Sequence, residues 1–298
     1  MGEGARARGP SAGADTVVGV DGGTQLGFDF PTTRLVRVTP SKLATWDDCP
    51  RRYRLTYLDR PAPSRGGARA GSTLGAVVHL ALRALFDLPP ARRTPEAAAA
   101  LVDRYWSSEG FRDAAQADEY RERARGWLAD YAAELEPDAE TVGLERWVSV
   151  ATDRIVAEGR ADRIDRRGDE LVVVDYKTGR RRPTPDDTAA SQALALYAVA
   201  AERTLHRRCT QVELHHLPSG EVAAWRHDPA SLQGHVRRAE TTAEELDSAA
   251  GALAAGGGAD ALFPARPAPR CGRCDVRRHC PQGRAAAPEE PPWAGLAP

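Results

Sequence analysis

The sequence predicts an α/β protein, with a sheet of about five strands flanked by helices. Three observations lead to this fold class. Residues 171–177 form a near-continuous apolar run, typical of a strand buried on both faces, and the strand-like segment 154–165 precedes it across an Arg-Gly-Asp turn. A helical segment follows at 189–201. Two further strand-like segments, 212–217 and 221–226, are joined by a Pro-Ser-Gly turn and close the pattern as a hairpin.

The bulk properties limit the classes of function. The chain has 298 residues, enough for one large domain with an ample core. Its net charge of -1 excludes a broadly basic surface, so any contact with nucleic acid must be a local patch. No apolar stretch reaches about 18 residues, and the N-terminus lacks an apolar signal core, so we expect a cytoplasmic protein with no membrane association.

The first third of the chain is expected to contain a tail and then helices. Residues 1–33 are rich in Gly, Ala and Arg without periodicity, which predicts a disordered N-terminal tail. The first helix is expected near Pro40, with Ser41 as its cap, and Cys49 ends it just before a second helix.

A helical insert is expected over about 71–136. Its first helix, up to residue 86, is apolar on more than one side and therefore mostly buried, and it carries His79. Two more helices are expected at 95–106, capped by Thr94, and at 119–134.

The rest of the chain is expected to form the core and a short tail. The core covers about 142–254, beginning with a strand at 145–150 and ending with the long helix 229–254. Residues 284–298 are rich in Pro, Ala and Glu and are expected to be a disordered tail.

The apolar strand 171–177 ends in a group of polar side chains. Asp175 and Lys177 are two residues apart and point to the same side of the sheet, with Tyr176 opposite. If Asp162 of the neighbouring strand lies across from them, two carboxylates and one ammonium converge. Such oxygen donors suit Mg²⁺ or Mn²⁺, and a lysine beside the ion can orient an attacking water. Taken alone, Asp and Lys at a strand end are more commonly a solvated turn.

Four of the five cysteines form a second candidate site. In an intracellular chain they do not suggest a disulfide framework. Cys271, Cys274 and Cys280 have the spacing of metal ligands, and Cys49 supplies a fourth thiolate. Four thiolates bind either Zn²⁺ or a [4Fe–4S] cluster. Cys209, at the start of a predicted strand, is interpreted as a small buried apolar residue.

Three segments occur in a specific order between these cysteines: Gly-x-x-x-His at 75–79, Gly-Arg-Ala-Asp-Arg-Ile-Asp at 159–165, and Asp-Tyr-Lys-Thr-Gly at 175–179. Over about 39–283 the chain resembles the RecB-like exonuclease branch of the PD-(D/E)XK nuclease superfamily. The resemblance implies a nuclease domain over 34–283 with a restriction-endonuclease-like mixed central sheet flanked by helices. It also implies a metal-dependent DNA nuclease, a RecB-family exonuclease in DNA repair or recombination.

The resemblance assigns roles to individual residues. It implies that Mg²⁺ or Mn²⁺ is bound by His79, Asp162, Asp175 and the carbonyl of Tyr176. Asp162, Asp175, Lys177 and Tyr197 are then the catalytic set, in which Lys177 positions the water and Tyr197 helps to place Lys177 or the phosphate. Glu158, four residues before Asp162 on the same strand, is a weaker candidate.

The chain departs from the family pattern at one position. The family places a Gln four residues before the Tyr of the helix that follows the Lys strand, whereas Gln192 lies five residues before Tyr197 and Ala193 holds the aligned position. Four residues subtend about 40° on a helix and five about 140°, so Gln192 is not expected on the face of Tyr197. An alternative function is therefore a catalytically impaired DNA-binding or assembly module that retains the fold.

The cysteine pattern also resembles this branch, with one Cys far upstream and three close together downstream. The resemblance implies that Cys49, Cys271, Cys274 and Cys280 hold a [4Fe–4S] cluster that clamps the N- and C-terminal segments together, with Zn²⁺ as the alternative. A third possibility is a zinc-stabilised scaffold whose Asp and Lys form ordinary surface pairs.

Basic residues near both candidate sites are candidates for contacts with the DNA backbone. They are Arg180, Arg181, Arg182, Arg277 and Arg278. A solvated loop is the ordinary alternative for such runs. DNA ends or single strands are the implied substrates. The sequence has no Gly-x-x-x-x-Gly-Lys-[Ser/Thr] loop, so a helicase motor would have to be a separate partner.

Overall fold

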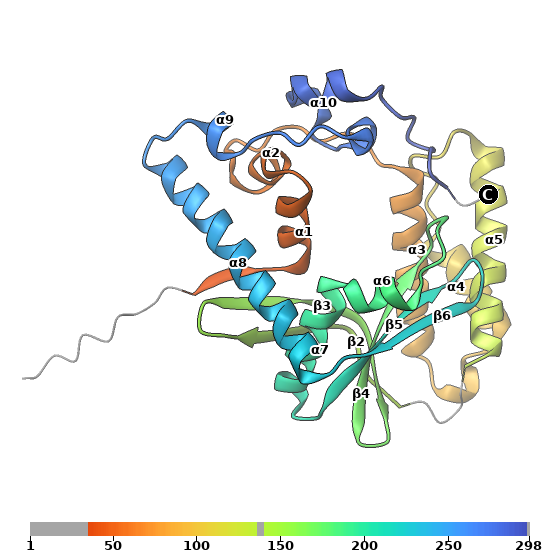
Figure 1. Ribbon diagram of the computed structural model, residues 1–298. Helices are drawn as coiled ribbons and strands as arrows, with labels where there is room; N and C mark the ends of the chain where they lie inside the picture. Colours follow the sequence, from red (N-terminus) through yellow and green to blue (C-terminus); the bar gives the residue numbers. More distant parts are fainter. Residues whose placement is uncertain (1–34, 136–139, 297–298) are drawn as a thin grey trace, which may run out of the picture. The chain divides into compact units, whose positions relative to one another are not determined.

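The computed structural model describes residues 35–135 and 140–296 (Figure 1). They belong to one compact unit, Arg34–Pro298. The tail expected at 1–33 lies outside the described residues.

The centre of this unit is a six-stranded mixed sheet. Its strands are β1 Val36–Val38, β2 Glu140–Ala151, β3 Ile155–Arg167, β4 Glu170–Lys177, β5 Cys209–His216 and β6 Glu221–Arg226. The order is β1-β3-β4-β5-β6, with β2 paired to β3, and the β1–β3 and β4–β5 pairs are parallel. The predicted mixed sheet flanked by helices is confirmed. The sequence did not predict β1, because three residues are too short to show a period.

Strand β3 organises the sheet because it has three neighbours. One edge pairs with β2 along almost its whole length. The other edge pairs with β1 at residues 155–157 and with β4 at residues 163–167. Asp162 lies between these two ladders, directly before the residues that pair with β4.

Helices cover both faces of the sheet (Figure 1). The helices α1 Pro40–Asp48, α7 Gln192–Leu205 and α8 Pro229–Ala254 share one apolar core with Val173 of β4. The helices α3 Ala70–Phe86, α4 Pro95–Tyr105 and α5 Ala114–Ala133 share a second core with Val172 and Val174. Successive residues of β4 are thus buried on opposite faces, which explains its continuous apolar run.

The remaining helices are short. They are α2 Pro50–Tyr53, continued by a π-helical turn at Arg54–Leu58, together with α6 Pro185–Ala190, α9 Ala259–Leu262 and α10 Pro281–Ala286. Turns of 3₁₀ helix lie at Pro90–Arg92, Pro269–Arg273 and Arg277–His279. None of the helices in the described part of the chain has the length and apolar character needed to span a bilayer.

Three helix starts differ from the sequence prediction, and that of α4 agrees. The helix expected at 189–201 begins at Gln192, because Ser191 caps it and separates it from α6. Thr39 rather than Ser41 caps α1, because its side chain accepts from the backbone N–H of Lys42 and Pro40 takes the first helical position. Helix α5 begins five residues earlier than predicted, where Asp113 supplies the cap. Thr94 caps α4 as predicted.

The C-terminal segment differs from the expected disordered tail, because it runs against the body of the domain. The backbone N–H of Glu290 donates to the carbonyl of Gly272 at 2.8 Å, and that of Ala70 donates to the carbonyl of Pro292 at 3.1 Å. Leu296 is buried in the core of α3–α5. The composition of the tail does not reveal its backbone hydrogen bonds, and it contains a single large aliphatic residue, Leu296, that is buried.

Candidate metal centre

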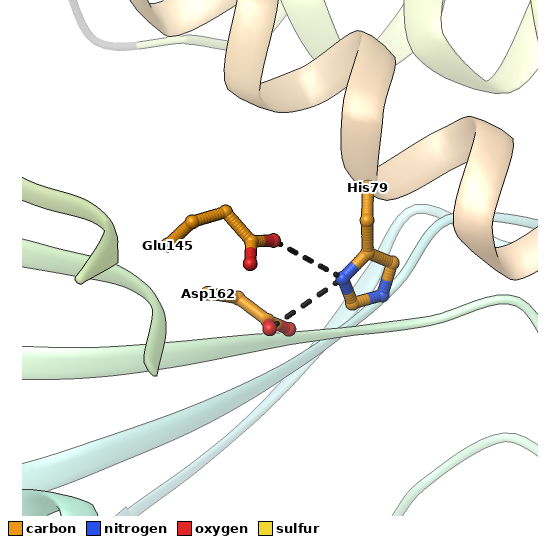
Figure 2. A group of neighbouring side chains, drawn as sticks. All are labelled: His79, Glu145 and Asp162. Carbon is orange, nitrogen blue, oxygen red and sulfur yellow. Dashed lines mark ion pairs between the residues drawn. The ribbon is translucent and has the colours of Figure 1, made fainter. Parts of the chain in front are cut away.

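Three side chains from different elements meet beside the sheet: His79 of α3, Glu145 of β2 and Asp162 of β3 (Figure 2). One ligand atom from each lies within 4.8 Å of the others. Nδ1 of His79 is 3.4 Å from Oδ1 of Asp162 and 3.7 Å from Oε1 of Glu145. An imidazole nitrogen and two carboxylates are a donor set that suits a divalent cation, so these residues fit such an ion.

Strand pairing places the two carboxylates of this group opposite each other. The β2–β3 ladder pairs Leu144 with Arg163 and Arg146 with Ala161, and Glu145 and Asp162 are the residues between these pairs. Glu145 has a φ of 45°, in the left-handed region that non-glycine residues seldom adopt. Such strain costs on the order of 1–3 kcal/mol and is held here by the ladder on either side.

The end of β4 adds a carboxylate and an ammonium. Asp175 follows the last pair of the β3–β4 ladder, and the backbone N–H of Tyr176 donates to Oδ2 of Asp162 at 3.1 Å. Nζ of Lys177 is 2.5 Å from Oδ2 of Asp175. Asp175 lies outside the three-residue group. The backbone N–H of Tyr176 holds Asp162, and the carbonyl of Tyr176 stays a predicted metal ligand.

The close carboxylates change the pKa values of their neighbours. Burial alone lowers the pKa of His79, but the hydrogen bond and charge of Asp162 outweigh it and raise that pKa. Burial raises the pKa of Asp175, and Asp162 raises it further against the opposing effect of Lys177. Protons therefore compete with a metal ion for this site more strongly than at ordinary side chains.

Tyr197 lies across β3 next to this group. A β-carbon added at Gly159 would lie 2.8 Å from Cε1 of Tyr197, so only glycine allows this close approach. Burial and the charges of Asp162 and Asp175 raise the pKa of Tyr197 to about 12. Its hydroxyl is therefore protonated at neutral pH and can act as a hydrogen-bond donor.

Gln192 points away from the site. Its Nε2 donates to the carbonyl of His235 at 2.9 Å, and its Oε1 is 3.0 Å from Nδ1 of the same residue. This agrees with the expectation that it does not share the face of Tyr197. Glu158, the weaker candidate, pairs with Arg37 at 3.0 Å.

A buried polar network supports the end of β4 from the opposite face of the sheet. Nη1 of Arg163 donates to the hydroxyls of Tyr131 and Tyr176 at 2.7 and 3.0 Å, and Nη2 lies 3.0 Å from Asp165. His215 is 2.9 Å from the hydroxyl of Tyr131. The network fixes the ring of Tyr176, the residue between Asp175 and Lys177.

The metal-free protein is expected to become more stable when Asp175 is replaced by asparagine. Because the folded pKa of Asp175 is raised, folding is favoured while the carboxyl is protonated, and stability is lost as pH rises from about 3.9, the unfolded value, through the folded pKa. An asparagine side chain carries no charge, so thermal unfolding in a chelator should show a higher melting temperature for Asp175→Asn at pH 7. The advantage should shrink towards pH 4. A variant less stable than wild type at pH 7 would contradict the raised pKa.

Most of the predicted DNA-contacting arginines have partners within the chain. Arg181 pairs with Asp187 at 2.7 Å and Arg182 with Glu221 at 2.6 Å. Arg277 donates to the carbonyl of Gly283 at 3.0 Å, and Arg278 to the hydroxyl of Ser64 at 3.5 Å. Arg180 is exposed. These contacts leave less free positive charge than the sequence suggests.

The four cysteines of the second candidate site line one cavity of about 450 Å³, and all are free thiols. The backbone N–H of Arg266 donates to the sulfur of Cys49 at 3.5 Å, which links the N-terminal segment to this cavity. Gly66 donates to the carbonyl of Asp275 at 2.7 Å, so the two segments also join through backbone. Cys209 is buried elsewhere, and burial raises its pKa to about 12.

Glu145 is the site residue that sequence reasoning missed. The sequence predicts Glu145 only as the first residue of the strand 145–150. Its place opposite Asp162 depends on the β2–β3 register, and neither that register nor the positive φ leaves a signal in the sequence.

The comparison with known families agrees with this geometry. A family model described as the PD-(D/E)XK nuclease superfamily matches residues 37–281. No curated protein matches the chain. The mixed sheet flanked by helices is consistent with the restriction-endonuclease-like fold of that superfamily.

Proposed function

Because the chain belongs to the PD-(D/E)XK nuclease superfamily, we propose that it is a metal-dependent deoxyribonuclease of the RecB-like exonuclease branch. One observation carries the proposal. A histidine and carboxylates from three elements converge within ligand distance, beside an ammonium held at the end of β4. DNA repair or recombination is the proposed role, and a separate helicase is the proposed partner.

His79, Asp162 and Asp175 are the proposed ligands of Mg²⁺ or Mn²⁺, with Glu145 as an additional one. The chemistry that such an ion supplies is polarisation of the scissile phosphate and a lowered pKa for water. Asp162 is held in place by the N–H of Tyr176. Asp175 orients Lys177 through their ion pair.

Lys177 is proposed to position the attacking water and to offset charge on the phosphate. Its side chain is 47% exposed, so the ammonium can reach a substrate while Asp175 holds it. Lys42 and Lys177 are the two lysines of the sequence, whose other basic residues are arginines. A compact ammonium at this position, in a chain that otherwise prefers guanidinium, supports a chemical requirement for lysine.

The cysteine cavity is proposed to hold a [4Fe–4S] cluster with a structural role. The arginines around it would offset the negative charge of four thiolates, and they are Arg51, Arg52, Arg69, Arg266, Arg270 and Arg273. Four thiolates also suit tetrahedral Zn²⁺, which is the alternative occupant of this cavity.

Anaerobically purified protein is expected to contain iron and acid-labile sulfide, and Cys49→Ala is expected to lose both. Cys209→Ala is the matched control, since Cys209 lies outside the cavity, and it should retain them. Elemental analysis of the purified proteins measures this. Zinc in place of iron, or iron retained in the Cys49→Ala variant, would contradict the assignment of a [4Fe–4S] cluster.

Cleavage of end-labelled linear DNA tests the proposed function. Single- and double-stranded substrates are incubated with protein and Mg²⁺ or Mn²⁺, with a chelator in a parallel reaction. We expect metal-dependent release of short labelled products from DNA ends. Internal cuts would replace the exonuclease assignment with endonuclease action. No cleavage by a protein that still binds DNA would favour the impaired binding module.

A further inference from the structure

Large apolar side chains are exposed next to the candidate metal centre. Trp147 of β2 is 58% exposed and Leu80 of α3 is 46% exposed. Both line a cavity of about 630 Å³ that also contains His79 and Asp162. Clefts of about 300–1,000 Å³ typically hold small ligands, so this one has room for part of a nucleic-acid strand.

Trp147 lies two residues along β2 from the ligand Glu145. Trp147 pairs with Arg160 across the β2–β3 ladder. Each lies two residues from a carboxylate of the metal group, because Trp147 follows Glu145 and Arg160 precedes Asp162. The backbone of Trp147 therefore lies about 7 Å along the strand from Glu145, whereas the guanidinium of Arg160 turns back to Glu145, with its Nε 2.7 Å from Oε2.

Helix α3 forms the other wall of the same cavity. Leu80 directly follows His79, and Arg83 lies one turn further along the helix and is exposed. The side chains of α3 that complete the wall are small, since they belong to Ser72, Gly75 and Ala76. The wall thus leaves space in front of the exposed indole of Trp147.

We propose that Trp147, with Leu80, is a stacking platform for an unpaired base beside the scissile phosphate, and that Arg83 binds the adjoining backbone. The substrate class is then single-stranded DNA, which deepens the proposed nuclease function and rests on it. Bases present flat faces that stack on an indole, and a phosphate complements the guanidinium group of Arg83. In a duplex the base faces are already stacked, so the platform selects unpaired strands.

Binding of a labelled single strand to the full-length protein tests the platform without cleavage. It is measured in the Lys177→Ala background and without divalent ions, against an abasic strand of the same length. Trp147→Ala is expected to weaken binding of the base-containing strand about 5- to 150-fold and to leave the abasic strand unchanged. Trp147→Phe should restore most of the loss. The matched control is Trp225→Ala on β6, a tryptophan that is 39% exposed and outside this cavity, and it should change nothing.

Arg83→Gln separates the backbone contact from stacking. It is expected to weaken both strands equally and to reduce the salt dependence of binding by about one phosphate contact. Equal losses on both strands for Trp147→Ala, or no loss, would overturn the platform. Cleavage by the wild-type protein is measured separately. If the wild-type protein cleaves DNA but Trp147→Ala binds the base-containing strand as tightly as wild type, the platform is contradicted and the nuclease function is not. An inactive wild type contradicts the nuclease, while the binding comparison still decides the platform.

Discussion

Replacing Lys177 with alanine is expected to slow DNA cleavage by about 10²–10³-fold, the effect of removing one charge that stabilises a transition state. The ammonium is 2.5 Å from Asp175 at the end of β4, and the lysine side chain is about half exposed. Its removal takes away positive charge and leaves the histidine and carboxylate ligands unchanged. The rate should therefore fall while the affinity for Mn²⁺ does not.

Single-turnover cleavage of a labelled strand measures this effect. Lys42→Ala is the matched control, because Lys42 is the other lysine of the chain and lies over the ring of Tyr57 on the first helices. It should cleave at the wild-type rate. A Lys177→Ala enzyme that retains the wild-type rate would show that the lysine has no part in catalysis.

The second large effect concerns stability, because Arg163 holds a buried charge cluster together. Its side chain is 4% exposed and that of Asp165 is 2% exposed, with 3.0 Å between them. Its guanidinium also lies 4.6 Å from the ring centre of Phe86 and donates to two tyrosine hydroxyls. Removal of one partner of a buried pair typically costs about 3–5 kcal/mol. Without Arg163, Asp165 would keep only Arg167, 3.6 Å away, and the hydroxyl of Thr141.

Arg163→Met is therefore expected to lower the free energy of unfolding by about 3–5 kcal/mol in chemical denaturation. Arg166→Met is the control on the same strand, since Arg166 forms a half-exposed pair with Glu140. It should cost less than about 1 kcal/mol. The double variant Arg163→Met with Asp165→Leu should recover most of the loss. Equal effects of the two single variants would contradict the role of the buried pair.

The sequence predicted the part of the site that depends on a local hairpin. The short turn between β3 and β4 fixes their register, and that register brings Asp162 next to the end of β4. The helical period of α3 predicted a mostly buried helix around His79, and the helix is buried on several sides. Where residue spacing determines geometry, the sequence was sufficient.

The rest depends on contacts between distant segments. Glu145 lies opposite Asp162 only through the β2–β3 pairing and an unusual φ angle. Nothing in the sequence indicates that the hydroxyl of Tyr131 accepts a hydrogen bond from Arg163. The C-terminal segment packs through backbone hydrogen bonds, which composition does not reveal.

Titration calorimetry with Mn²⁺ measures most directly whether His79, Asp162 and their neighbours hold a divalent cation. The wild-type protein, without DNA, should show one class of site. Asp162→Asn should weaken it by more than about 100-fold, since loss of an outer-shell group alone costs 10–100-fold. Asp169→Asn, an exposed carboxylate in the β3–β4 turn, should bind as wild type. The metal centre would be contradicted by an Asp162 variant that binds Mn²⁺ as tightly as the wild-type protein.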